Sequence, residues 1–221
     1  MCGNWLTLLD EAASSMGVPL ETKQLGLFDR YYREIMGWNA KINLLSRSSS
    51  EDTLLKNFID SLTVVQLLPE RGGMVLDMGS GGGFPGIPLK IACPNMQVSL
   101  LESSRKKTSF LKHIIRTLQL TEITVIHERA ENLAGKDCYR NSFDMVLSKA
   151  AFKLPQFLAL GAPFLRPGGV LMAMKGDQIS DELAEAQSAA ASAGLLLTAT
   201  NSLTLPVTAD RRQILIYTKT Q

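Results

Sequence analysis

Hydrophobic residues in the first third of the chain recur with the spacing of amphipathic helices. Three such stripes precede residue 68, and Gly17 with Pro19 and then Gly37 interrupt the first two. Because an apolar stripe must be buried against another element, the stripes predict a helical cap on a larger core. They consist of Trp5, Leu8, Leu9, Ala12, Ala13 and Met16, of Leu25, Phe28, Tyr32, Ile35 and Met36, and of Leu55, Phe58, Ile59, Leu62 and Val65.

From about residue 74 the pattern changes to short β-rich runs that alternate with helical segments, such as 105–118 and 181–192. This alternation is typical of βαβ units and of a mainly parallel sheet. A short segment containing Pro206 joins the last two strands, so we expect them to pair antiparallel at an edge. The seven predicted strands are 74–78, 98–102, 123–127, 143–148, 170–175, 195–205 and 213–218.

Pro69, Gly72 and Gly73 interrupt the pattern between the helical part and the sheet. The sequence therefore predicts two domains, a helical cap over residues 1–67 and an α/β domain over residues 68–221.

Composition limits the class of protein. Of the 221 residues, 45% are hydrophobic and 20% charged, as in soluble globular proteins. Cys2, Cys93 and Cys138 lie far apart without zinc-site spacing, so we expect no metal and a reducing, cytoplasmic setting. The first residues lack the basic region of a signal peptide, and no apolar run reaches the ~18 residues that span a bilayer, so we expect no membrane association. The net charge of +2 permits a nucleic-acid partner without indicating one.

The strongest chemical signal is a glycine-rich turn between the first predicted strand and the helix after it. Residues 75–86 read Val-Leu-Asp-Met-Gly-Ser-Gly-Gly-Gly-Phe-Pro-Gly. Glycine allows a sharp turn and a close approach to a ligand. Because Gly81, Gly83 and Gly86 also satisfy the dinucleotide fingerprint, the glycines alone do not choose between nucleotide cofactors.

Two acidic residues bear on the cofactor, and one of them, Asp77, helps to choose between the cofactor classes. Asp77 lies two residues before Gly79, where its carboxylate would repel a pyrophosphate and suit the ammonium group of a methionine moiety. Glu102 closes the second predicted strand, where an acid hydrogen-bonds a ribose in both cofactor classes. The alternative for Glu102 is a solvated strand end.

The chain resembles the S-adenosyl-L-methionine-dependent methyltransferases in its seven predicted strands, its Asp-x-Gly-x-Gly turn and Glu102. Within that class, the chain from about Leu27 onward resembles the small-subunit (16S) ribosomal RNA guanine-N7 methyltransferase family, also called the glucose-inhibited division protein B family. The matching segments are Asn-Ala-Lys-Ile-Asn-Leu at 39–44, Phe-Ile-Asp-Ser-Leu at 58–62, Gly-Phe-Pro-Gly-Ile-Pro-Leu at 83–89, Arg-Ala-Glu at 129–131 and Lys-Gly at 175–176.

The resemblance implies an α/β fold, with a Rossmann-like seven-stranded sheet that is mostly parallel, has an antiparallel edge and carries an N-terminal helical extension. It implies methyl transfer from S-adenosyl-L-methionine to N7 of a guanine in 16S ribosomal RNA, with that RNA or the small ribosomal subunit as partner, and we expect a monomer. Lys149 and Asn57 depart from the family pattern, which has Arg and His there. The expected cofactor-binding residues are Asp77, Gly79, Gly81, Phe84, Glu102, Ala130, Glu131 and Lys149.

The end of the fourth predicted strand carries no acid-base motif. Residues 148–151 read Ser-Lys-Ala-Ala. They lack the Asn/Asp-Pro-Pro-aromatic motif that methyltransferases acting on the exocyclic amines of bases usually carry there. Guanine N7 has a free lone pair and no proton to lose, so its methylation needs alignment rather than a general base. We therefore name no catalytic residue beyond Lys149 as a positioning candidate.

Basic residues at loop and strand ends are candidates for phosphate contacts, because the open edge of such a sheet admits ligands. Two other functions stay open at this point: an NAD-binding oxidoreductase of the Rossmann type, and a catalytically idle cofactor-binding module. The RNA-binding candidates are Lys41, Arg47, Lys175, Arg211 and Arg212.

Overall fold

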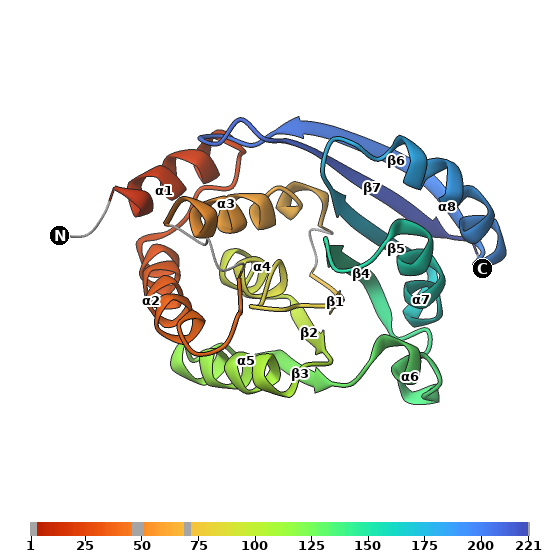
Figure 1. Cartoon of the computed structure of the whole chain (residues 1–221), viewed down its shortest axis with the longest axis horizontal. Coiled ribbons are helices and arrows are strands. Elements are labelled where there is room, and N and C mark those ends of the chain that lie inside the picture. The colour runs from red at the N-terminus through yellow and green to blue at the C-terminus, as the bar shows by residue number, and fades with distance from the viewer. Residues whose placement is uncertain (1–3, 46–50, 69–71, 221) are drawn as a thin grey trace.

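The computed structural model describes residues 4–45, 51–68 and 72–220. Its centre is one seven-stranded sheet with the strand order β3-β2-β1-β4-β5-β7-β6 (Figure 1). β7 runs antiparallel to both of its neighbours, and the other pairings are parallel, which confirms the predicted antiparallel edge. The strands are β1 (Met74–Met78), β2 (Gln97–Glu102), β3 (Ile123–His127), β4 (Phe143–Lys149), β5 (Leu165–Lys175), β6 (Leu195–Thr204) and β7 (Arg211–Lys219).

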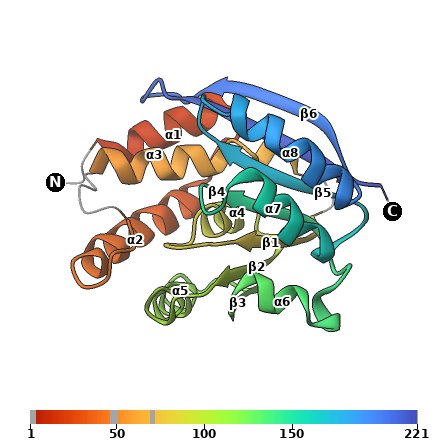
Figure 2. The same cartoon turned by 45° about the vertical axis from the view of Figure 1, so that its right-hand side comes forward.

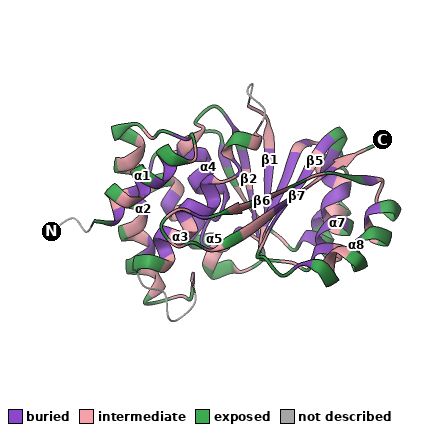
Figure 3. Cartoon of the chain, turned by 90° about the horizontal axis from the view of Figure 1, so that it is seen from above, coloured by how far each residue is buried: buried purple, intermediate pink, exposed green. Residues whose placement is uncertain are grey.

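Helices cover both faces of the sheet, as Figures 1 and 2 show. One hydrophobic cluster joins the sheet to five helices, and a second cluster joins its opposite face to three. Figure 3 shows these buried residues between the layers. The first group is α1 (Trp5–Ser15), α2 (Thr22–Asn39), α3 (Glu51–Leu62), α4 (Gly86–Ala92) and α5 (Arg105–Thr117), and the second is α6 (Ala130–Ala134), α7 (Leu154–Gly161) and α8 (Ser180–Ser192).

The N-terminal helices share their core with the sheet. All three predicted stripes form helices, and α2 begins with a capping box in which Glu21 and Gln24 satisfy each other's backbone N–H groups. Because α1, α2 and α3 pack into the same cluster as α4 and α5, one apolar core holds both parts of the chain. The division into a cap over 1–67 and a domain over 68–221 stays a prediction.

Two details of the predicted pattern were wrong. The buried face of α2 carries Phe28, Tyr31 and Ile35, whereas Met36 is exposed, so the stripe includes Tyr31 rather than Met36. β5 begins at Leu165 instead of residue 170, because its pairing with β4 shifts register around Asp144 and so includes the segment with Gly168 and Gly169.

Five aromatic rings bind the N-terminal helices to the glycine-rich turn. Phe58 of α3 lies at their centre, with its ring centroid 5.3 Å from Phe28, 5.5 Å from Tyr31, 5.6 Å from Phe84 and 6.0 Å from Trp5. Aromatic pairs at such separations stabilise a core beyond the area they bury. The turn after β1 is therefore supported by residues that precede Phe84 by 26 positions or more in the chain.

Within the described ranges, no helix is both long enough and apolar enough to cross a membrane.

Candidate functional site

The glycine-rich turn follows β1 and leads into α4. Gly79 has φ +77°, and a Cβ atom there would lie 2.5 Å from the Cβ of Ala151. Gly83 has φ +99°, and its Cβ would lie 2.5 Å from the Tyr31 hydroxyl oxygen. Both positions need glycine, because the backbone is left-handed and another chain segment approaches closely.

Glu102 fixes the same turn from the end of β2. Its Oε2 accepts a hydrogen bond from the Gly81 N–H at 2.9 Å, and its Oε1 accepts one from the Ser104 N–H at 2.7 Å. The residue is 7% exposed, so the alternative of a solvated strand end is wrong. Each carboxylate oxygen keeps a second lone pair for a ligand hydroxyl.

A hollow of about 180 Å³ opens beside the turn, and we call it the cofactor hollow. Four of the expected cofactor-binding residues meet there, although they come from three separate parts of the sequence: Gly79, Glu102, Ala130 and Glu131. Phe152, which the sequence did not indicate, closes one side. The lining consists of Gly79, Leu101, Glu102, Ser103, Glu128, Arg129, Ala130, Glu131 and Phe152.

Asp77 lies under the turn and is fully buried. Its Oδ2 accepts a hydrogen bond from the Gly86 N–H at 2.9 Å, whereas its Oδ1 is buried with no hydrogen-bond partner in the described part of the chain. Burial raises the pKa of the carboxyl to about 7, against the opposing effect of the Gly86 hydrogen bond. Asp77 does not line the cofactor hollow, but an unpaired acceptor beneath the turn is compatible with the cationic S-adenosylmethionine and unfavourable for a dinucleotide pyrophosphate, so the residues present fit the methionine cofactor.

Tyr31 holds the turn from the opposite side. Its hydroxyl donates a hydrogen bond to the Gly82 carbonyl, and its ring stacks on Phe84 with centroids 5.7 Å apart. Burial raises the pKa of this hydroxyl well above its ordinary value, so it remains a donor. The sequence did not mark Tyr31, because helical spacing admitted its neighbour Tyr32 equally well.

Neither Lys149 nor Phe84 lines the cofactor hollow. The Lys149 ammonium is hydrogen-bonded to Asn57 Oδ1, lies 3.7 Å from Asp60 Oδ2 and lies 5.4 Å from the centre of the Phe84 ring. Burial lowers the pKa of Lys149, and the Asp60 carboxylate opposes that shift. The two residues that depart from the family pattern, Asn57 and Lys149, are thus in direct contact. Phe84 is 6% exposed and lines neither hollow.

A second hollow of about 400 Å³ lies between α3 and the ends of β4, β5 and β7, and we call it the basic hollow. It contains two of the RNA-binding candidates, Lys175 and Arg212, together with Lys149. Among the described residues that line the basic hollow, Asp60 is the one acidic residue. The lining consists of Thr53, Lys56, Asn57, Asp60, Lys149, Ala150, Met174, Lys175, Gly176 and Arg212.

The remaining RNA-binding candidates lie elsewhere. Lys41 is exposed after α2, and Arg211, with 71% of its side chain exposed, pairs with Asp177. Arg47 falls outside the described residues. In the described ranges, no three His, Cys, Asp or Glu side chains gather as a metal site would require.

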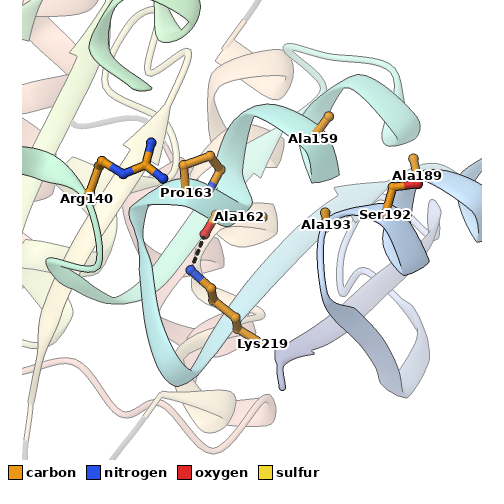
Figure 4. A pocket seen from close by; sticks show the side chains of 8 residues that line it. All are labelled: Arg140, Ala159, Ala162, Pro163, Ala189, Ser192, Ala193 and Lys219. Atoms are coloured by element: carbon orange, nitrogen blue, oxygen red, sulfur yellow. Dashed lines mark hydrogen bonds between the residues drawn. The ribbon is translucent and has the colours of Figure 1, made fainter. Parts of the chain in front are cut away.

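A third hollow, of about 390 Å³, lies at the opposite edge of the sheet (Figure 4). Its lining is rich in alanine and includes Arg140 and Lys219, whose ammonium donates to the Ala162 carbonyl at 3.0 Å. None of the expected site residues lies there. Since ligands of open α/β sheets bind at the carboxyl ends of the strands, this hollow at the amino ends of β4 and β5 is not the candidate site.

Comparisons with known proteins agree with the resemblance seen in the sequence. The family model described as rRNA small subunit methyltransferase G matches residues 24–214. The protein named ribosomal RNA small subunit methyltransferase G from Syntrophus aciditrophicus is 44% identical over 216 residues, covering 97% of this chain and 90% of the relative. The protein of that name from Geobacter sp. (strain M21) is 39% identical over 210 residues, covering 95% of each chain.

Solved structures support the fold. M. jannaschii TYW2 in complex with AdoMet superposes with a TM-score of 0.61 at 17% identity, covering 75% of this chain and 76% of that one. A methyltransferase from Pyrococcus furiosus gives a TM-score of 0.60 at 14% identity, covering 87% and 98%. At these identities the likeness shows the fold alone.

We expect Tyr31→Phe to weaken binding of S-adenosylhomocysteine and to lower the free energy of unfolding by ~1–3 kcal/mol, because it leaves the buried Gly82 carbonyl unpaired. The matched control is Tyr32→Phe, whose hydroxyl bonds to Glu51 in an exposed setting. Calorimetric titration and thermal unfolding of both variants measure the effect. Equal affinities for the two variants would show that Tyr31 does not position the turn.

Asp77 gives a prediction on pH. A carboxyl whose pKa is raised on folding contributes stability below its ordinary pKa of 3.8, and that stability is lost as the pH rises through about 7. Asp77→Asn removes this titration, and its side-chain oxygen can still accept the hydrogen bond from the Gly86 N–H. From pH 5 to pH 8 the free energy of unfolding of the variant should therefore rise relative to that of the parent, by on the order of a few kcal/mol. Thermal unfolding of both proteins measures this difference. Parallel stability curves for variant and parent across this range would refute the assignment.

Proposed function

Because the chain belongs to the rRNA small subunit methyltransferase G family, we propose that it transfers the methyl group of S-adenosyl-L-methionine to N7 of a guanine in 16S ribosomal RNA. We propose further that the substrate is presented as RNA or as the small ribosomal subunit, and that the protein acts as a monomer in the cytoplasm. Neither an NAD-dependent oxidoreductase nor an idle binding module is supported by this family membership.

One observation carries the proposal: the segment after β4 lies between the cofactor hollow and the basic hollow. Lys149 and Ala150 line the basic hollow, and Phe152, two residues later, lines the cofactor hollow. The Cβ of a residue at position 79 would touch Ala151, so this segment also lies against the glycine-rich turn. A methyl donor in the cofactor hollow and an anionic RNA in the basic hollow would therefore lie close together, because only residues 150–152 separate the two hollows.

The chemistry needs few groups from the protein. When bound, the cofactor supplies a methyl group on a sulfonium sulfur, which the N7 lone pair takes while the sulfur keeps the bonding electron pair. Glu102, Tyr31 and Asp77 fix the backbone of the turn, so the donor side is ordered before the substrate arrives.

Proton transfer is not part of this reaction, and the end of β4 offers no free base. The Ser148 hydroxyl donates to the Met78 carbonyl at 2.9 Å, and Lys149 is bonded to Asn57. The protein therefore accelerates the reaction by holding the two reactants in line.

We expect 7-methylguanosine as the product. RNA from a strain that lacks the gene is incubated with labelled cofactor and the purified protein, and the labelled nucleoside is identified after digestion. Because no proton is lost and Asp77 is ionised above about pH 7, the rate should be nearly flat at mildly alkaline pH. A methyl group on an exocyclic amine or on a pyrimidine carbon would contradict the proposal.

A further inference from the structure

Two cations in the basic hollow share a single carboxylate. Asp60 of α3 lies with Oδ1 3.3 Å from Nε of Arg212 and with Oδ2 3.7 Å from Nζ of Lys149. Only 17% of the Arg212 side chain and 13% of the Lys149 side chain are exposed. Asp60 is therefore the one carboxylate of the described residues at ion-pair distance from either cation, and the more distant Asp77 and Asp210 act on Lys149 and Arg212 without touching them.

The other two cations of the basic hollow have carboxylates of their own. Lys56 pairs with Asp210 at 2.7 Å, and Lys175 pairs with Glu182 at 2.7 Å. Lys175 follows Met174 on β5 and points to the face covered by α8, whereas Lys149 and Arg212 lie on the face covered by α3. Lys149 and Arg212 are thus the two cations of the basic hollow that do not each have a carboxylate of their own in direct contact.

Arg212 also has an unused donor. Its Nε bonds to Asp60 and its Nη1 donates to the Arg211 carbonyl at 2.9 Å, while Nη2 has no partner in the part of the chain that the structure describes. A guanidinium and an ammonium side by side, with a free N–H and one shared carboxylate in contact, form a binding site for an oxyanion.

Building on the proposed function, we propose that the basic hollow binds a phosphodiester group of the RNA, between Lys149 and Arg212, beside the guanosine that is methylated. Asp60 is the positioning residue that holds the two cations together. With about 400 Å³, the hollow has room for more than a phosphate group, so part of the adjoining nucleotide enters with it.

The competing anion is the carboxylate of the cofactor. Lys149 on β4 lies beside β1 and 5.4 Å from the centre of the Phe84 ring, so the argument against this anion comes from the position of Arg212 in the sheet. Arg212 lies on β7, three strands from β1 in the order β1-β4-β5-β7. With strands ~4.8 Å apart, this places it roughly 14 Å across the sheet from the glycine-rich turn. No residue lines both the basic hollow and the cofactor hollow in the described structure.

The test compares two adjacent arginines. Arg212→Gln removes the guanidinium in the basic hollow, and Arg211→Gln removes an exposed one next to it. We expect Arg212→Gln to raise KM for the RNA about tenfold and to make binding less salt-dependent by about one phosphate contact. Arg211→Gln should raise KM much less, and Arg33→Gln, on α2, should match the parent. Calorimetric affinity for S-adenosylhomocysteine should be unchanged in all three.

An unchanged KM in Arg212→Gln would overturn the inference. So would an equal rise of KM in Arg211→Gln, because it would indicate an effect of general surface charge. Weaker binding of S-adenosylhomocysteine by Arg212→Gln would also overturn it, because it would assign the basic hollow to the cofactor carboxylate. If Arg212→Gln does not fold, Arg212→Lys keeps the charge and should give an intermediate KM, and a parental KM in that variant would also count against the site. In each case the parent still forms 7-methylguanosine, so these failures are distinct from failure of the proposed function.

Discussion

The structure depends on a left-handed glycine turn in which side chains from outside the turn add to the hydrogen bonds of its own backbone. Three side chains from three elements hold it: Glu102 accepts from the Gly81 N–H, Asp77 accepts from the Gly86 N–H, and Tyr31 donates to the Gly82 carbonyl. Two of these anchors are acids beside a buried turn, and the backbone N–H groups, two at Glu102 and one at Asp77, offset part of the cost of burying the carboxylates. The turn and the acids therefore stabilise each other, and the cofactor hollow is shaped by both.

This constraint explains why the N-terminal helices share a core with the sheet. Tyr31 reaches the turn from α2, and Phe58 of α3 packs against both Tyr31 and Phe84. If α1, α2 and α3 were removed, the Gly82 carbonyl would lose its donor and Phe84 would lose two neighbouring rings. The N-terminal helices therefore help to shape the candidate site, wherever a domain boundary is drawn.

Sequence patterns predicted the parts of this arrangement that are local. Alternating strands and helices, the glycine-rich turn and Glu102 each carry their signal within a few residues, and they predicted the fold and the antiparallel edge. Of the four expected residues that line the cofactor hollow, Ala130 and Glu131 came from the family resemblance alone. Tyr31, Asp60 and Phe152 were missed, because their roles arise from contacts with segments 50 or more residues away. Helical spacing could not separate Tyr31 from Tyr32, since only the packing of Phe58 decides which ring faces inward.

Charge is distributed along the carboxyl edge of the sheet in the order of the strands. Glu102 on β2 and Asp77 on β1 lie at one side, and Lys149 on β4 and Arg212 on β7 lie at the other. A cationic cofactor and an anionic RNA would each find opposite charge on its own side. Two such cations, each less than one-fifth exposed, would repel each other without Asp60, because burial weakens the screening by water. Since Asp60 comes from α3, the N-terminal helices supply both the donor that fixes the glycine turn and the carboxylate that makes the basic hollow possible.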